Sequence, residues 1–377
     1  MPAGLLPRRR FCALGGATVA GVVLAGCAGA TRDDVVAEPT GAAGVARTPL
    51  GAILHDAALA PSSHNSQPWR VVVDGARLVL HADLQRALRD VDPAGRELRL
   101  SLGAFVENLV TSAAARGLAC EVAVTDEADL ARPVAELALA PAPPSGYPLD
   151  RLRLRCTVRR GLGTGALPRD AIAALIAADP TAVHFIDGRA APAAAIAEAT
   201  LAAFRQQTAR DSAQRELARW MRFANAEVRE QRDGLSPASM GITGLSGWYV
   251  RTFYDEADVM ASGFRTRSVE LTAAQVREAG GWLVVTSRDD QPRSVLEAGR
   301  TYERLALRAR EHGIGLHPMS QALEEAPYRA QLVRALAIDG VPQLVVRAGR
   351  VTAYPAPVTL RRPVASFAEV AARRGAS

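Results

Sequence analysis

The segment from residue 60 to residue 70 reads Ala-Pro-Ser-Ser-His-Asn-Ser-Gln-Pro-Trp-Arg and joins the end of a predicted helix to the start of a predicted strand. Eight polar or conformationally special residues stand in a row, from Pro61 to Pro68. Groups suited to hydrogen-bonding a polar ring edge and a polyol chain are supplied by Ser62, Ser63, Asn65 and Gln67. The segment therefore predicts a polar ligand-binding loop, with a purely structural turn as the alternative.

Helical and strand-like patterns alternate on both sides of this loop. The first part of the chain predicts helices over 49–60 and 100–116, a hairpin over 70–82, and strands over 121–125 and 136–140. A stretch rich in Pro and Gly, residues 141–146, is a candidate linker. The second part predicts helices over 168–178 and 296–312 and strands over 282–286 and 343–347.

The two long predicted helices align at an offset of 196 residues, the separation of Gly103 and Gly299. In this register the identical pairs are Gly103 and Gly299, Glu107 and Glu303, Leu109 and Leu305, Ala113 and Ala309, and Gly117 and Gly313. Each helix ends at the last glycine of its set, as a C-cap glycine would require. The register indicates an internal duplication, although two Ala-rich amphipathic helices could share residues by composition alone.

Residues 196–265 have no counterpart in the first half of the chain. A long polar helical stretch over 196–232 is followed by a glycine-rich, apolar loop over 234–247. A segment of this kind predicts a lid over a binding site, and a surface excursion that packs on the body is the alternative.

The chain has no lysine, so all 45 basic residues are arginine. This excludes a phosphate-binding loop lysine, a lysine Schiff base to pyridoxal phosphate and a lysine general base. Any bound phosphate is expected to be held by arginine, hydroxyl or backbone N–H groups. The net charge is +6, but arginines and acids alternate after the first residues, so no nucleic-acid partner is expected.

The first 27 residues predict an export signal. Arg8-Arg9-Arg10-Phe11 resembles a twin-arginine motif, and an apolar run follows it. Leu24-Ala25-Gly26-Cys27 resembles a lipobox, in which Cys27 would be lipidated. We therefore expect an exported protein, anchored by lipid on the outer face of the cytoplasmic membrane, with residues 28–47 as a flexible tether. A plain membrane anchor is the alternative, and no other membrane contact is expected.

Cysteine and histidine predict no metal site. Outside the signal only Cys120 and Cys156 remain; they could pair, but they do not make a disulfide framework. No CxxC, HxxxH or HExxH spacing occurs among the cysteines and histidines. The glycines at 161, 163 and 165 lack the strand–helix context of a dinucleotide-binding loop and predict a turn.

The loop motif Pro61-Ser62-Ser63-x-Asn65-x-Gln67-Pro68-Trp69 resembles that of the nitroreductase family of flavoproteins. Members of this family are usually homodimers that bind FMN at the subunit interface. The resemblance extends to Asp92-Pro93-x-x-Arg96 and to the helix from Gly103 to Gly117. Gly313-Ile-Gly-Leu316 and Pro318-Met319-Ser320-Gln321 resemble the segment along the flavin ring, and Arg361-Arg362-Pro363 resembles the basic phosphate site.

The resemblance implies two fused halves, 48–148 and 149–377, that mimic the family homodimer, most similar to an actinobacterial branch whose members are dormancy-associated. It implies an α+β fold with central mixed or antiparallel sheets flanked by helices. A single chain would then do the work of a dimer, so a monomer is expected.

The resemblance also implies one complete FMN site. The second half alone has an Arg- and Thr-rich segment like the family's phosphate-binding start, and the first half alone has the polar loop. The expected cofactor residues are Ser62, Ser63, His64, Asn65, Gln67 and Pro68 from the first half, and Arg155, Thr157, Arg159, Pro318, Met319, Ser320, Gln321, Arg361 and Arg362 from the second. No catalytic side chain is expected, because the flavin would carry the chemistry.

The implied activity is reduction of a small nitroaromatic or quinone by NAD(P)H through FMN. A flavin-sequestering or stress-associated protein with little turnover is the main alternative, because export separates the protein from cytoplasmic NAD(P)H and residues 196–265 could cover the flavin. An exported lipoprotein that has lost FMN and acts by interaction is the third reading, and retention of both parts of one site argues against it.

Overall fold

The computed structural model describes residues 32–36 and 44–371. The predicted signal, with the twin-arginine motif and Cys27, lies outside the described residues. None of the described helices is both long and apolar enough to cross a membrane.

The first sheet is built mainly by the first part of the chain. It contains β1 (Trp69–Asp74), β2 (Arg77–Ala82), β3 (Leu118–Val124), β4 (Pro133–Pro141) and β9 (Ala368–Val370), in the order β3-β4-β2-β1-β9. Gly75 begins the β1–β2 turn with a φ of +59°, which favours glycine. The pairs within β1–β4 are antiparallel, whereas β9 from the C-terminal end pairs parallel with β1. The last strand of the chain therefore completes the sheet of the first half.

The second sheet repeats the arrangement of the first. It contains β5 (Val183–Asp187), β6 (Gly281–Ser287), β7 (Ile314–Pro318) and β8 (Val341–Arg350), in the order β5-β6-β8-β7, with antiparallel pairs throughout. In chain order, these strands occupy the same positions as β1, β2, β3 and β4 in the first sheet. The central strands β6 and β8 are buried on both faces, which explains the apolar runs at residues 282–285 and 344–346.

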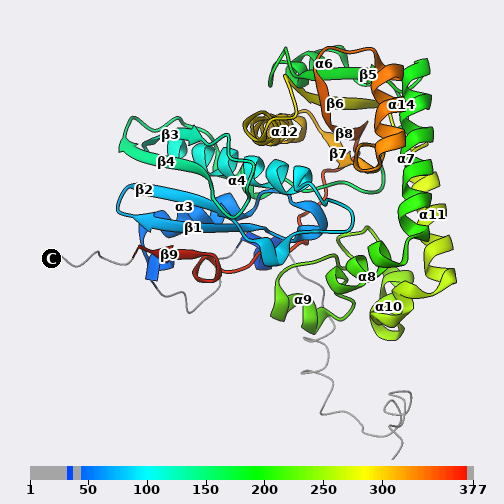
Figure 1. The fold of residues 1–377 in the computed structure, drawn as a ribbon, viewed down its shortest axis with the longest axis horizontal. Coiled ribbons are helices and arrows are strands. Elements are labelled where there is room, and N and C mark those ends of the chain that lie inside the picture. The colour runs from blue at the N-terminus through cyan, green and yellow to red at the C-terminus, as the bar shows by residue number, and fades with distance from the viewer. Residues whose placement is uncertain (1–31, 37–43, 372–377) are drawn as a thin grey trace, which may run out of the picture.

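Two long helices lie between the sheets (Figure 1), α4 (Arg96–Ala115) and α12 (Pro292–Glu311). Each follows the second strand of its sheet and precedes the third. In the core of the first half, Phe105 of α4 packs on Trp69 at 5.0 Å between ring centroids and on Phe367 at 6.1 Å. Leu109 of α4 and its aligned counterpart Leu305 of α12 are both fully buried, the first in the core around the first sheet and the second in the core around the second.

Helix α3 (Pro49–Ala58) packs against α4, where the Ser112 hydroxyl donates to Asp56 at 2.9 Å. The N-terminus of α3 is capped by the Thr48 hydroxyl, which accepts from the Gly51 N–H. Two short elements precede it, α2 (Arg32–Val36) and the 3-10 helix η1 (Gly44–Arg47). Val35, Val45 and Ala46 are buried. At these positions the segment expected to be a flexible tether packs on the body, because its few apolar residues find core partners.

Between β5 and β6 the chain inserts α7 (Ala191–Ala209), α8 (Asp211–Trp220), α9 (Asn225–Gln231), α10 (Gly244–Phe253), the 3-10 helix η4 (Ala257–Met260) and α11 (Ser262–Gln275). The single helix expected over 196–232 is wrong: the structure has three, because the backbone becomes extended at Arg210 and again at Met221. Helix α7 runs beside α14 (Ala326–Leu336) (Figure 1). Residues 211–260, here called the insertion lobe, project from the far end of α7.

The remaining helices connect these parts: α5 (Leu149–Arg153), α6 (Arg169–Ile176) and α13 (Gln321–Glu324), with the 3-10 helices η2 (Ser63–Asn65), η3 (Leu84–Arg86) and η5 (Val364–Ser366). Cys120 and Cys156 are both free, so the pairing that the sequence left open does not form.

Candidate functional site

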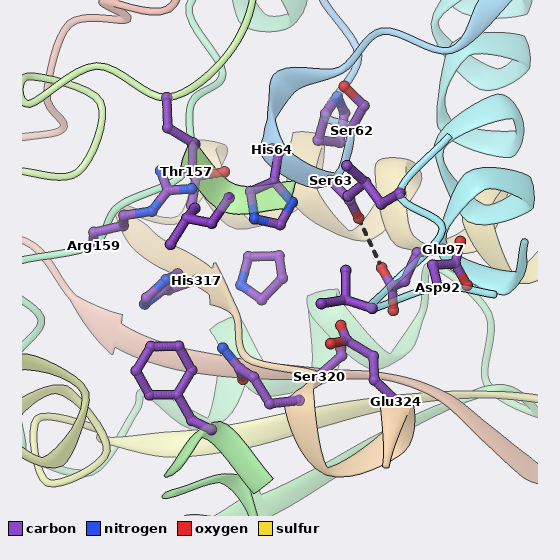
Figure 2. Close-up of a pocket in the computed structure, with 18 of the residues that line it drawn as sticks. Ser62, Ser63, His64, Asp92, Glu97, Thr157, Arg159, His317, Ser320 and Glu324 are labelled. Atoms are coloured by element: carbon purple, nitrogen blue, oxygen red, sulfur yellow. Dashed lines mark hydrogen bonds between the residues drawn. The ribbon is translucent and has the colours of Figure 1, made fainter. Parts of the chain in front are cut away.

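Two adjoining cavities lie between the parts of the chain that the sequence analysis singled out. The first has a volume of about 340 Å³ and the second of about 370 Å³. Both are lined by Pro61, Ser62, Thr157, Arg159 and Leu235, so the polar loop and the arginine-rich segment form their common wall. Figure 2 shows the first cavity, with the loop on one side and β7 and α13 on the other.

The polar loop has a strained backbone. His64, Asn65 and Gln67 have φ values of +52°, +51° and +53°, a region that costs a residue with a β-carbon about 1–2 kcal/mol. Buried hydrogen bonds hold this conformation: the Gln67 amide donates to the Arg232 carbonyl and accepts from the Arg362 N–H, each at 2.8 Å. The loop is thus fixed by the insertion and the C-terminal segment.

The same loop is braced at two further points. Asn65 donates its side-chain N–H to the Leu360 carbonyl at 3.2 Å, and the Gln67 N–H donates to the Ser62 hydroxyl at 3.0 Å. These contacts leave Ser62, Ser63 and His64 on the cavity side. Strain that is fixed by surrounding contacts is characteristic of binding and active sites.

Five arginines line the second cavity, and three of them, Arg155, Arg159 and Arg361, belong to the expected cofactor residues. Arg155 pairs with the fully buried carboxylate of Glu303 at 3.0 Å. Arg361 donates to the carbonyls of Leu59 and Ala60, and burial together with Arg155 lowers its pKa to about 9. Arg159 donates to the Ser239 carbonyl at 2.8 Å, and burial lowers its pKa as well.

Within the described part of the chain, no carboxylate forms an ion pair with Arg159 or Arg361. Burying a cation without an opposite charge is costly, and an anionic group would remove that cost. Guanidinium groups bind the oxygens of phosphate or carboxylate with two parallel hydrogen bonds. The second cavity therefore has the chemistry of an anion site.

The first cavity contains two neutral imidazoles (Figure 2). Burial, followed by the charge of Arg159, lowers the pKa of His64 to about 4. Burial, Arg159 and Arg347 lower the pKa of His317 well below its usual value. Arg347 donates to Nδ1 of His317 at 3.0 Å, so the imidazole proton resides on Nε2. His317 can therefore act as a hydrogen-bond donor in this cavity.

The opposite end of the first cavity is acidic (Figure 2). Asp92, Glu97 and Glu324 line it, and the Ser63 hydroxyl donates to Glu97 at 3.1 Å. Burial and the Glu97 charge raise the pKa of Glu324 to about 8, and the same two causes raise that of Asp92 to about 6. Gln207 of α7 donates to Glu324 at 2.7 Å. At neutral pH this end holds at least one protonated carboxyl group.

The insertion supplies an apolar wall to the first cavity. The lining side chains from this segment are Phe204, Leu217, Met221, Leu235, Met240, Phe264 and Leu271. Thioether and aromatic groups of this kind adapt to the shape of an apolar or aromatic ligand.

The structure brings most of the predicted cofactor residues to the two cavities. Those that line one or both are Ser62, Ser63, His64, Asn65, Arg155, Thr157, Arg159, Pro318, Ser320, Gln321 and Arg361. The other four do not line either cavity. Gln67 and Pro68 form the end of the loop, Arg362 is hydrogen-bonded to Gln67, and Met319 is in the core around β6 and β8.

Several lining residues escaped the sequence analysis. The sequence indicated Asp92 only as part of the Asp92-Pro93-x-x-Arg96 motif, and it did not indicate Glu97, His317 or Glu324. The motifs next to Glu97 and His317 could have drawn attention to them, but only the path of the chain brings these side chains and Glu324 to one cavity. Buried side-chain atoms without a hydrogen-bond partner in the described structure include His64 Nδ1, Asn65 Oδ1, Gln321 Oε1 and Arg361 Nε. These atoms mark unfilled hydrogen-bonding capacity beside the cavities.

No protein-family model matches the chain. The mycobacterial protein named "Putative NAD(P)H nitroreductase acg" (Mycobacterium tuberculosis) is 25% identical over 323 residues, 83% of this chain and 93% of the relative. A second protein of that organism, the NAD(P)H nitroreductase homologue Rv3131, is 28% identical over 337 residues, 84% of this chain and 90% of the relative. "Probable NAD(P)H nitroreductase PigM" of a Serratia strain is 26% identical over 314 residues, 78% and 86% of the two chains.

Among solved structures, the FMN-dependent nitroreductase NfnB of Mycobacterium smegmatis in complex with NADPH is 15% identical, with a TM-score of 0.34. That likeness covers 54% of this chain and 90% of NfnB. The sequence similarities, by contrast, cover 83% and 84% of this chain. The chain is thus a nitroreductase-family protein, a distant homologue over most of its length of the two mycobacterial proteins.

Proposed function

We propose that this protein binds one FMN across the two adjoining cavities and passes electrons from NAD(P)H to a small nitroaromatic or quinone. One observation carries the proposal: Arg159 and Arg361, which line the second cavity, are buried cations that form no ion pair with a carboxylate of the described residues, although the Glu303 charge acts on Arg361. A phosphate monoester would supply the missing negative charge there. The relatives' names point to the same redox activity.

The residues of the second cavity fit the phosphate end of FMN. Arg159 and Arg361 would bind its oxygens, and the Thr157 and Ser62 hydroxyls would add neutral hydrogen bonds. Arg155 would act mainly through its charge, because Glu303 already occupies one edge of its guanidinium.

The residues of the first cavity fit the ring end. Gln321 has a buried carbonyl oxygen without a partner, suited to an N–H group of a heterocycle. His317 can donate through Nε2, and Ser62 and Ser63 lie opposite on the loop. The apolar wall from the insertion would exclude water from an aromatic ring system.

The chemistry that FMN would supply is acceptance of a hydride from NAD(P)H and delivery of electrons to the second substrate. The protein itself would bind and orient FMN and shield it from water. Glu324, protonated at neutral pH, holds a proton at the acidic end of the first cavity. That proton would be available to a reduced acceptor placed beside it.

The test is an absorbance spectrum of the purified full-length protein, before and after anaerobic addition of NADPH. We expect a yellow protein with one FMN per chain that bleaches on reduction. Arg159→Gln should weaken FMN binding by roughly ten- to a hundredfold, the effect of losing a charge-assisted hydrogen bond. Arg169→Gln, an exposed arginine on α6, is the matched control and should bind FMN normally. A colourless protein that cannot be loaded with FMN would contradict the proposal.

A second function has one observation in its favour. The insertion places Met221, Met240 and Phe264 over the first cavity, where they could close the site to a second substrate. The protein would then sequester flavin with little turnover. FMN that stays oxidised under anaerobic NADPH would support this function over the reductase.

We also propose that the chain is a fused pseudo-dimer that works as a monomer. The identical strand order of the two sheets and the equivalent places of α4 and α12 support an ancestral duplication. Strand β9, which adds the chain's last segment to the first half's sheet, resembles an arm exchanged between subunits. Light scattering of the purified protein should give the mass of one chain.

Finally, we propose export and lipid anchoring at Cys27. The motifs at residues 8–11 and 24–27 support this proposal. Mass spectrometry of the protein recovered from its native membranes should find residue 27 as the N-terminus, carrying diacylglycerol. An intact Met1 N-terminus would contradict it.

A further inference from the structure

The outer face of helix α10 is apolar and exposed. Leu245 is 87% exposed, Trp248 54%, Tyr249 52% and Phe253 55%, and these four side chains are here called the α10 patch. Their spacing places them on one stripe of the helix. Trp248 and Phe253 lie 5.7 Å apart between ring centroids, and Tyr249 and Phe253 4.9 Å apart, so the patch is continuous.

The packing of the insertion lobe does not involve the exposed face of α10. Helix α10 is held by its inner face, where Val250 and Tyr254 join the small core of the insertion lobe with Met221 and Phe223. Large aromatic side chains gathered on an exposed stripe mark an interaction surface.

The beginning of the described chain lies on the same lobe. Val35 of α2 packs against Val228 of α9, and the Asp34 carboxylate lies 4.0 Å from Arg229. Helix α9 follows Phe223, whose ring packs on Tyr254 at the end of α10. These contacts place α2 beside α9, which belongs to the same lobe as α10.

We propose that the α10 patch docks on the surface of a lipid bilayer, with its aromatic side chains in the headgroup region. The inference rests on the lipid anchor proposed at Cys27. Four residues lie between Cys27 and Arg32, and the five steps along the chain limit the distance between their Cα atoms to about 18 Å. A lipid on Cys27 would hold the insertion lobe close to the membrane, and the patch has the Trp, Tyr and Leu composition of interfacial helices.

The size and charge of the patch favour a bilayer over a second copy of the chain. The four side chains of the patch, each more than half exposed, offer on the order of 400 Å² of apolar surface. A stable protein–protein interface needs about 800 Å² of surface from each partner. Helix α10 carries a single charged residue, Arg251. Docking should therefore depend on apolar insertion, need no anionic lipid and persist at high salt.

The test measures Trp248 fluorescence with phosphatidylcholine vesicles that contain brominated acyl chains, which quench a tryptophan inserted in the bilayer. The full-length protein is compared with Trp248→Phe, and the difference isolates the emission of Trp248. We expect strong quenching of this difference signal at low and high salt. Trp220→Phe is the matched control, because Trp220 lies between Arg86 and Arg222, and it should leave the quenching unchanged.

A second variant tests the patch without removing the probe. Leu245→Glu alters the most exposed patch residue and should abolish most of the quenching, whereas Val333→Glu on α14, 41% exposed, should not. Vesicle binding without Trp248 quenching would overturn the docking proposal and would mean that the N-terminal segment alone attaches the protein to the vesicle. Self-association without vesicles that Leu245→Glu abolishes would overturn it in favour of a second copy. Failure of the proposed lipid anchor would be detected independently, because mass spectrometry of the N-terminus would then find no diacylglycerol on Cys27.

Discussion

Gly103 of α4 and Gly299 of α12 face each other where the two helices cross. A β-carbon on Gly103 would lie 3.0 Å from the Gly299 Cα and would overlap the Leu296 carbonyl oxygen. A β-carbon on Gly299 would overlap the Leu100 carbonyl oxygen. Leu100 and Leu296 are separated by the same 196 residues as the two glycines, so the contact is reciprocal. This is the pattern of a twofold interface, here within one chain.

Substitution at this crossing should be costly. Gly103→Ala is expected to lower the free energy of unfolding by on the order of 2 kcal/mol or more, because neighbouring backbone cannot move away without separating the helices. Chemical denaturation measures the effect. Gly263→Ala is the matched control: this glycine is also helical but has open space around its Cα. That variant should be neutral or more stable, and equal destabilisation of both variants would contradict the close approach.

The Arg155–Glu303 and Arg151–Glu311 ion pairs should contribute very differently to the free energy of unfolding. Arg155 and Glu303 are buried, whereas the side chains of the Arg151–Glu311 pair at 2.8 Å are 45% and 29% exposed. Removing one partner of a buried pair leaves a charge without compensation, so Arg155→Met should cost about 3–5 kcal/mol of unfolding free energy. Arg151→Met should cost less than about 1 kcal/mol. Equal losses in denaturant titrations would refute the distinction.

Glu324 should make stability depend on pH. Its pKa is raised to about 8 by burial and by Glu97, so its contribution to stability is present below the unfolded-state pKa and is lost as pH rises through about 8. Glu324→Gln should remove this loss, with a gain on the order of 2 kcal/mol at alkaline pH relative to wild type.

Denaturation midpoints across this pH range measure the Glu324 effect. Glu270→Gln on the exposed surface of α11 is the control and should keep the wild-type slope. Parallel profiles for wild type and Glu324→Gln would show that the carboxyl group of Glu324 does not titrate with folding.

Ala337 ends α14 in the left-handed region, with a φ of +47°. Glycine adopts this conformation without a steric cost, so Ala337→Gly should stabilise the protein by about 1 kcal/mol. Ala335→Gly, two residues earlier inside the same helix and equally exposed, should destabilise it by about the same amount. Melting temperatures of the two variants should therefore move in opposite directions. A shift in the same direction would rule out the left-handed cap.

The sequence predicted local structure best where one pattern governs it. The hairpin with its turn at Gly75, the long helices that Gly117 and Gly313 follow, and the aligned glycines all have their predicted places. The long helix expected over 196–232 was wrong, because local propensity does not reveal the turns that packing imposes at Arg210 and Met221. Strand β9 has only three residues and pairs with β1, so no local pattern could predict it.

By itself the sequence determined that a polar loop joins a helix to a strand near residues 60–70, that two long helices carry aligned glycines, and that any anion is held without lysine. Only the tertiary structure decided that Arg159 and Arg361 share a cavity without carboxylates, while Asp92, Glu97 and Glu324 gather in its neighbour. The physical reason is that burial and charge pairing depend on the path of the whole chain. Hydrophobic periodicity and turn residues act over a few positions, and these a sequence displays directly.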